Sequence, residues 1–405
     1  MKTTAKKSSW RLFFSGLLPL LVLAHFGHHV VAGQLTPLLP FIRSELHLDY
    51  TRSGFLVSSF TFCYGFSQLP AGWLTDRVGR RVLILVSTSG MAVAGILIGL
   101  SPNYLAMAIC LMLLGTCGGG YHPSSAPLVS ASVEPSKRGQ ALGIHQIGGN
   151  ASHFLSPLIA VGLARAFGWR GSFITMGIFG MILGIALYIL LGQQELTKIA
   201  RPEKSATTEE RLAVPNYLRR LVVFLIVAIG VQALNASVIL FSTLFLVDRL
   251  KISGEAAAGL LSIVYFVALF AGPVAGYLSD RVGSLTVVLT VSFFVGLAVL
   301  TLGAVPYIWG VSALLAIIGF CNWARMPTSE SYIISHVSER HRGTILGVYF
   351  GGMRALPSII TPTVGFLADH FGFTTSFTIL GVAMLFLTLV CSVFLWGTRE
   401  RTPVA

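Results

Sequence analysis

Six of the ten histidines in this chain lie within long apolar stretches, where ionisable side chains are uncommon. Three of them, at positions 25, 28 and 29, have the i, i+3, i+4 spacing that puts side chains on one face of a helix. Imidazole titrates near physiological pH, so it can take up and release protons without a permanent charge. We therefore predict a proton-coupling group that consists of His25, His28, His29, His122 and His153.

Two other interpretations of these histidines stay open. A buried histidine is most often a hydrogen-bonded packing residue, and the sixth one, His145, lies about 100° around its helix from the face of His153. The i, i+4 pair of His25 and His29 is also a metal-ligand spacing. Because no carboxylate or thiolate lies beside this pair, we expect no metal site.

Two arginines also interrupt apolar stretches, Arg325 and Arg354. An arginine at the centre of a span costs about 2.5–3.5 kcal/mol on insertion scales, so it is functional by default. The planar guanidinium group suits a carboxylate or phosphonate, and the alternative is a structural arginine bonded to an acid or to carbonyls. We predict an anion-binding site formed by Arg325, Arg354, Asn322, Tyr121, Gln146 and Asn150.

Acidic side chains follow the opposite pattern, because none lies near the middle of an apolar stretch. Asp76, Asp248, Asp280, Glu255 and Asp369 all fall at the ends. A site for a lipophilic cation needs a buried acid to pair with the cation, so we expect an anionic rather than a cationic ligand.

The apolar stretches themselves predict the elements that position these residues. The 405 residues are 54% hydrophobic and 11% charged, against about 25% charged in soluble domains. A helix crosses a bilayer with about 20 apolar residues, and lipid leaves the backbone no other hydrogen-bond partner. We predict an all-α membrane protein with twelve transmembrane helices, at 12–35, 51–74, 81–101, 104–131, 140–163, 172–192, 219–246, 256–279, 285–304, 308–335, 343–367 and 374–396.

The net charge of +13 indicates membrane topology and not nucleic-acid binding. If the N-terminus is inside, most Lys and Arg between the spans fall on the inner side, which predicts two cytoplasmic termini in a plasma or inner membrane. The basic N-terminus resembles a signal peptide without the usual cleavage site, so we expect a retained first helix. The five cysteines lack disulfide or metal spacing and are expected to be packing residues.

The chain repeats itself with an offset of 204 residues, because GWLTDRVGR at 72–80 matches GYLSDRVGS at 276–284. Each half holds six spans, so both halves enter the membrane from the same side and form a parallel repeat. We predict an N-terminal bundle at 1–192, a cytoplasmic linker at 193–218 and a C-terminal bundle at 219–405.

The repeated segment resembles the loop signature of the major facilitator superfamily. That resemblance covers the whole chain and implies a secondary transporter that alternates between inward-open and outward-open states. It also implies that the signature sets the equilibrium between these states, with Asp76 facing a basic group or a helix N-terminus across the bundle interface. The residues concerned are Gly72, Asp76, Arg77, Gly79, Arg80 and Arg81, with Gly276, Asp280 and Arg281 in the second copy.

A narrower resemblance, to the fosmidomycin-resistance type of efflux protein, rests on the segments around His25, Tyr121 and Gln146. This chain has His29 and Ser124 where that type carries acids, so the coupling groups of that type are not transferred.

Together these patterns predict proton-coupled transport of a small organic anion, powered by a proton gradient and needing no cofactor. The alternatives are efflux of toxic compounds and a non-transporting membrane sensor; no nucleophile–base pair indicates an enzyme. The expected partners are a small-molecule substrate and the lipid bilayer, with no nucleic acid, and the expected state is a monomer.

Overall fold

The computed structural model describes residues 17–48, 50–198, 217–252 and 254–395, which form helices and short turns with no strand among them. The N-terminal half contains α2 (Leu18–Ala32), α3 (Leu35–Glu45), α4 (Tyr50–Val78), α5 (Arg80–Leu100), α6 (Tyr104–Gly118), α7 (Tyr121–Ala131), η1 (Pro135–Lys137) and α8 (Arg138–Lys198). The C-terminal half contains α10 (Tyr217–Leu250), α11 (Gly254–Val282), α12 (Ser284–Leu302), α13 (Ile308–His336), η2 (Glu339–His341) and α14 (Arg342–Leu395).

Two of these helices are too long for a single membrane crossing. α8 has 61 residues and α14 has 54, whereas about 20 residues cross the hydrocarbon core. Each is broken by one glycine with positive φ, Gly168 at 71° and Gly372 at 75°. Glycine adopts this conformation without steric cost because it has no Cβ. α8 therefore supplies the predicted crossings 140–163 and 172–192, and α14 supplies 343–367 and 374–396.

The number of crossings agrees with the predicted twelve. Within the described residues, nine helical segments are long and apolar enough to cross a membrane, and the segments that contain α8 and α14 each provide two crossings. The twelfth is α4, which has 29 residues but carries enough polar side chains to lower its hydropathy. The predicted first crossing, 12–35, begins outside the described residues, and most of the predicted linker 193–218 also lies outside them.

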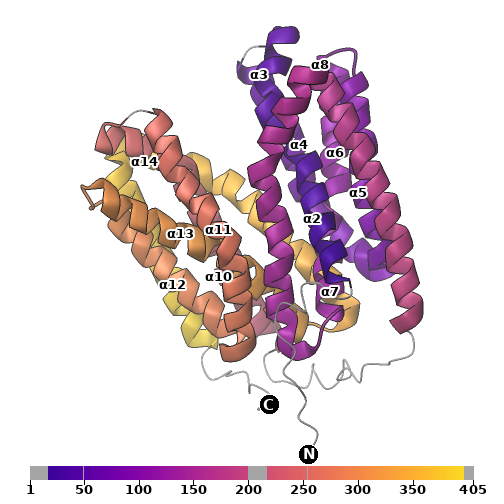
Figure 1. The fold of residues 1–405 in the computed structure, drawn as a ribbon. Coiled ribbons are helices and arrows are strands. Elements are labelled where there is room, and N and C mark those ends of the chain that lie inside the picture. Colours follow the sequence, from indigo (N-terminus) through magenta and orange to yellow (C-terminus); the bar gives the residue numbers. More distant parts are fainter. Residues whose placement is uncertain (1–16, 49, 199–216, 253, 396–405) are drawn as a thin grey trace, which may run out of the picture.

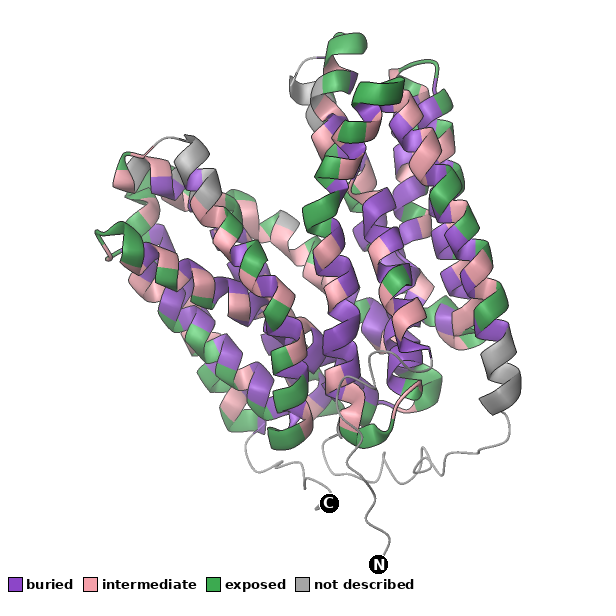
Figure 2. Cartoon of the chain, in the orientation of Figure 1, coloured by how far each residue is buried: buried purple, intermediate pink, exposed green. Residues whose placement is uncertain are grey.

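The outer surface of the helices is apolar, as a surface solvated by lipid must be. Phe62 is 72% exposed, Phe154 70% and Val393 73%, and such side chains alternate with buried ones along most helices (Figure 2). A soluble protein rarely exposes large contiguous apolar patches. This surface supports the prediction of an integral membrane protein.

The helices form two bundles, α2 to α8 and α10 to α14, which lie closest at one end and diverge toward the end that carries α3 (Figure 1). We call the first the motif end and the second the open end. Across the interface, α4 packs against α14 and α8 against α11. The backbones of the paired helices are in direct contact there. A Cβ at Gly72 would clash with the carbonyl oxygen of Gly343, and a Cβ at Gly276 would clash with the carbonyl oxygen of Gly139.

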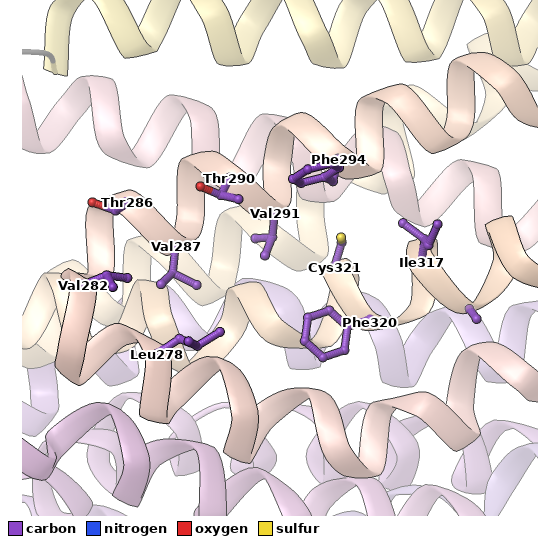
Figure 3. Close-up of a pocket in the computed structure, with 11 residues that line it drawn as sticks. Leu278, Val282, Thr286, Val287, Thr290, Val291, Phe294, Ile317, Phe320 and Cys321 are labelled. Atoms are coloured by element: carbon purple, nitrogen blue, oxygen red, sulfur yellow. The ribbon is translucent and has the colours of Figure 1, made fainter.

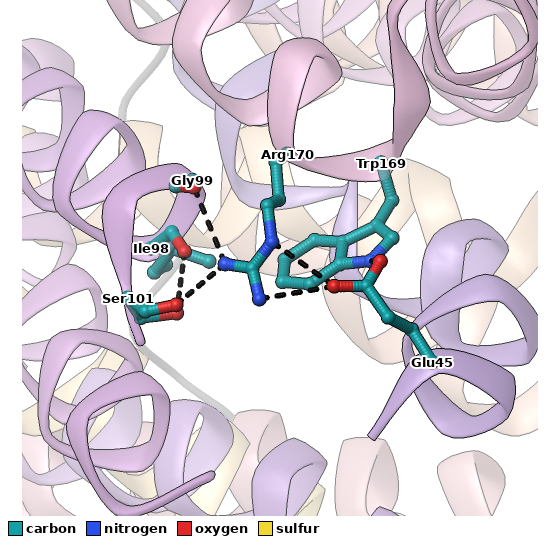
Figure 4. A network of polar contacts seen from close by, with 6 residues as sticks. All are labelled: Glu45, Ile98, Gly99, Ser101, Trp169 and Arg170. Carbon is teal, nitrogen blue, oxygen red and sulfur yellow. Dashed lines mark hydrogen bonds and ion pairs between the residues drawn. The ribbon is translucent and has the colours of Figure 1, made fainter. Parts of the chain in front are cut away.

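At the open end, the N-terminal bundle is held together by a polar network (Figure 4). Glu45 of α3 accepts a hydrogen bond of 2.6 Å from the Trp169 indole and pairs with Arg170 at 3.1 Å. Arg170 in turn donates to the backbone carbonyls of Ser101 and Gly99. The network thus joins α3, the end of α5 and the segment of α8 that follows the break at Gly168.

Candidate functional site

The six histidines of the apolar stretches form one cluster, contributed by α2, α7 and α8. We call it the histidine cluster, and its ring centroids are separated by 4.2–5.8 Å where neighbouring rings meet. Five of the rings are buried, whereas His153 is exposed and lies near Trp323 of the other bundle. The cluster unites the five predicted histidines with the sixth, His25, His28, His29, His122, His153 and His145.

Close packing of small residues brings these rings together. A Cβ at Gly149 of α8 would lie 2.7 Å from Cε1 of His25, and one at Gly148 would meet the Val22 carbonyl oxygen. The ring of His145 stacks on His25 at 4.2 Å. His145 joins the cluster although it lies about 100° around the helix from His153, because α2 packs against the face of α8 that carries His145.

Two tyrosines contact the histidine cluster, and one of them, Tyr64, also lies beside Arg354. Tyr64 shares a 3.0 Å hydrogen bond between its hydroxyl and Nε2 of His28, and Tyr121 stacks on His28 at 4.4 Å. The Arg354 guanidinium lies 5.6 Å from the centre of the Tyr64 ring. Arg354 is exposed and interacts electrostatically with His28, His122 and His153. The structure thus brings this predicted anion ligand and Tyr121 together with the histidines.

The other predicted arginine has a different setting. Arg325 is 1% exposed, and one of its terminal nitrogens, Nη2, donates to Oε1 of Gln232 at 2.5 Å. Its second terminal nitrogen, Nη1, has no hydrogen-bond partner among the described residues. One turn earlier, Asn322 accepts a 2.8 Å hydrogen bond from Asn235. Arg325 and Asn322 therefore belong to a polar group inside the C-terminal bundle, separate from the histidine cluster.

A buried acid, Glu330, lies between the bundles, away from the middle of its span but inside the apolar interior. Glu330 is 1% exposed within α13, and its Oε1 accepts a 3.2 Å hydrogen bond from the Gln146 amide of α8. Oε2 has no partner among the described residues. The signal was available in the sequence, because Glu330 lies within the predicted span 308–335.

Gln146 and Asn150 also bridge the bundles, so both predicted substrate ligands have partners in this conformation. The Asn150 amide donates 2.8 Å to the carbonyl of Ala268 in α11. Together with Gln146 and Glu330, this contact joins α8 to two helices of the C-terminal bundle.

The two copies of the sequence signature form matching contacts at the motif end. Asp76 accepts hydrogen bonds from the backbone N–H groups of Gly343 and Thr344, at 2.8 and 2.7 Å, and from the Thr344 hydroxyl at 2.6 Å. Asp280 accepts from the N–H groups of Gly139 and Gln140, both at 2.7 Å. Each carboxylate therefore sits at the N-terminus of a helix in the opposite bundle, where the helix dipole favours negative charge.

The remaining signature residues support these contacts. Arg80 forms a 3.0 Å ion pair with Glu339 of the other bundle. Arg81 donates to the Tyr188 carbonyl, while Arg77 and Arg281 lie over the rings of Trp73 and Tyr277. Gly79 and Gly283 have φ values of 97° and 91°, which explains the glycine in both copies.

The extra hydroxyl contact of Asp76 predicts unequal effects at the two carboxylates. Asp76→Ala should open the motif end more than Asp280→Ala, because one more charge-assisted hydrogen bond, about 1.5–3 kcal/mol, is lost. Spin labels on cysteines placed at the exposed positions Ser136 and Arg340 in a cysteine-free background would measure the separation. Thr344→Val, which removes the hydroxyl alone, should account for the difference; equal effects of both alanine variants would contradict this account.

An apolar groove of about 550 Å³ lies on the C-terminal bundle between α11, α12 and α13 (Figure 3). Its lining includes Val291, Phe294, Phe320 and Cys321. The groove offers no charged group, so its chemistry suits an apolar chain and not a charged substrate. The histidine cluster with Arg354 remains the candidate site, with Glu330 between the bundles and Arg325 inside the C-terminal bundle as separate charged groups.

The chain is similar to known transport proteins in sequence and in fold. The sequence matches the family described as Major Facilitator Superfamily over residues 21–362, and again over 225–405. The multidrug resistance protein MdtG of Proteus mirabilis is 28% identical over 381 residues, which cover 91% of this chain and 92% of that protein. The proton:xylose symporter XylE aligns with a TM-score of 0.75 at 15% identity, over 97% of both chains. The human organic anion transporter TETRAN aligns with a TM-score of 0.72 at 14% identity, over 93% of this chain and 98% of that one.

Proposed function

The chain belongs to the Major Facilitator Superfamily and is a secondary transporter of the membrane, and we propose that it carries a small organic anion with a carboxylate or phosphonate group. The observation that supports this substrate class is the pair of intramembrane arginines. Arg354 is exposed beside Tyr64 and the histidine cluster, and Arg325 keeps the Nη1 donors without a hydrogen-bond partner among the described residues. Guanidinium groups bind such anions through two parallel hydrogen bonds.

We orient the motif end toward the cytoplasm, as the distribution of Lys and Arg predicts. The bundles are joined at this end by Asp76, Asp280 and Glu330. The conformation is therefore outward-open, with Arg354 and His153 exposed on the path of the substrate. Release to the other side would require the motif-end contacts to separate.

We place the coupling proton at Glu330. A carboxylate that is buried without a cation is costly, so the neutral acid is favoured while the motif end is closed. No ion pair of Glu330 occurs within the described part of the chain, and its titratable neighbours are Tyr121, Tyr349 and, next to Tyr349, Arg325. When the bundles part, Glu330 meets water and releases its proton to the cytoplasm.

The histidines are less suited to this step than the sequence suggested. Their rings lie so close together that protonating one opposes protonating the next. Their predicted role in coupling stays a prediction.

Substitution of Arg354 tests the substrate class. A thermal-shift screen of carboxylates and phosphonates on purified protein would select a substrate for counterflow in proteoliposomes. Arg354→Ala should then reduce counterflow about ten- to hundredfold, because a hydrogen bond to a charged group contributes about 1.5–3 kcal/mol. Arg354→Lys should recover part of it, and Arg340→Ala, at an exposed arginine of η2, should change nothing. Unchanged transport in Arg354→Ala would rule out the anion site.

A second candidate is drug export, which the likeness to multidrug resistance protein MdtG favours. The same site would then exchange the exported compound for the proton of Glu330. Cells that lack the gene would become more sensitive to the exported compound, and everted vesicles would accumulate it. Uptake by intact cells without altered drug sensitivity would instead support import of the anion.

A further inference from the structure

Three members of the histidine cluster have the arrangement of ligands around one ion. His25, His29 and His122, which we call the histidine triad, come from two successive turns of α2 and from α7. One ring nitrogen of each lies within 4.8 Å of the others. All three side chains are buried, at 1%, 7% and 4% exposure. The sequence spacing offered only the α2 pair, and the fold adds the third ligand.

The spacing of the rings agrees with coordination of a single metal ion. Zinc–nitrogen bonds of about 2.0–2.1 Å in a tetrahedral site place imidazole centres roughly 5 Å apart. In the triad the ring centroids are separated by 4.9, 5.3 and 5.4 Å. The nitrogens themselves, which lie within 4.8 Å of one another, must come closer when an ion binds, so binding requires the rings of the triad to turn.

A second observation concerns His25, which is held as metal-binding imidazoles are held. Its Nδ1 donates a 2.9 Å hydrogen bond to the backbone carbonyl of His145. A carbonyl only accepts, so Nδ1 carries the hydrogen and Nε2 presents a lone pair. Such a bond to a carbonyl fixes the tautomer and ring orientation of ligating histidines. The ring of His145 stacks on the His25 ring, and Gly149, which has no side chain, leaves room for it.

We propose that the histidine triad binds one divalent transition-metal ion of the Zn²⁺ class and leaves its fourth coordination position for water or an anion. Neutral imidazole ligands favour zinc, copper, nickel and cobalt, whereas Mg²⁺ and Ca²⁺ require oxygen ligands. The exposed ring of His153 lies 4.8 Å from His29, so a single ring separates the triad from the space between the bundles, and we expect the ion to exchange.

Metal titration of the full-length, tag-free protein in detergent tests this proposal. Calorimetry with Zn²⁺ should show one ion per chain, and Mg²⁺ should show no binding. Co²⁺ should give the intense visible absorption of a tetrahedral site and be displaced by Zn²⁺. His29→Ala and His122→Ala should each weaken Zn²⁺ binding about tenfold or more, because removal of one ligand disrupts the site. His370→Ala, at an exposed histidine bonded to its own helix, should leave binding unchanged.

The Co²⁺ spectrum of the unaltered protein provides a readout even if a triad variant fails to fold. An octahedral spectrum, no binding of Zn²⁺, or equal Zn²⁺ affinity in the triad variants and in His370→Ala would each overturn the proposal. Loss of binding in the triad variants with an unchanged melting temperature of the metal-free protein would support it.

Discussion

Glu330→Gln should abolish transport driven by a proton gradient while counterflow continues. Glutamine imitates the neutral acid, can still accept the hydrogen bond from Gln146, and cannot release a proton when the motif end opens. We expect gradient-driven uptake to fall roughly tenfold or more, because an ionisable group buried inside a span is the group that carries the proton across the membrane. Counterflow needs no net proton movement and should stay within about twofold.

The measurement compares both assays on the same proteoliposomes, with and without an imposed pH gradient. Glu134→Gln provides the matched control, because Glu134 undergoes the same chemical change but is an exposed residue that pairs with Lys137 of its own segment. It should respond to the gradient as the unaltered protein does. If Glu330→Gln retained its response to the gradient, the coupling proton would have to be carried elsewhere.

Gly72→Ala should hold the motif end open. A Cβ at Gly72 would meet the Gly343 carbonyl oxygen and would lie 2.8 Å from Cα and 3.0 Å from N of Gly347. All of these are backbone atoms, so α4 and α14 must separate to make room. Overpacking of this kind costs about 1–3 kcal/mol and would shift the population by roughly ten- to hundredfold.

Spin labels at Ser136 and Arg340 should report a longer distance in Gly72→Ala, and transport should decline accordingly. Gly162→Ala is the matched control, because a Cβ at Gly162 would meet nothing within 4 Å. An unchanged distance distribution in Gly72→Ala would show that the glycine contact does not determine closure.

Much of the fold was predictable because lipid permits few structures. Hydropathy gave the crossings, and the repeat matched Asp76 to Asp280, each of which accepts two backbone hydrogen bonds at a helix N-terminus of the opposite bundle. Helix boundaries were harder to predict. The predicted breaks 164–171 and 368–373 each prove to be a single non-helical glycine, Gly168 or Gly372, because hydropathy does not mark where a helix ends.

The sequence predicted which residue types form the candidate site, but not which of these residues lie together in the fold. Spacing along one helix placed His25 and His29 on one face, but the packing of α2 on α8 brought His145 into the cluster. Arg325 and Arg354 look equivalent in sequence, yet Gln232 holds one inside a bundle while the other is exposed between the bundles. Glu330 lies away from the middle of its span, and its contact with Gln146 of the other bundle could not be predicted from the spacing along one helix.

The network around Glu45 makes the two bundles mechanically unequal. At the repeat-related positions of Trp169 and Arg170 the C-terminal bundle has Phe373 and Thr374. Thr374 donates to the Gly303 carbonyl at 3.3 Å, just as Arg170 donates to that of Gly99 at 3.4 Å, but neither Phe373 nor Thr374 can form an ion pair. The open end of the N-terminal bundle thus has an ion-paired link that these two positions of the C-terminal bundle cannot form. We expect the N-terminal bundle to bend less than the C-terminal bundle in a transport cycle.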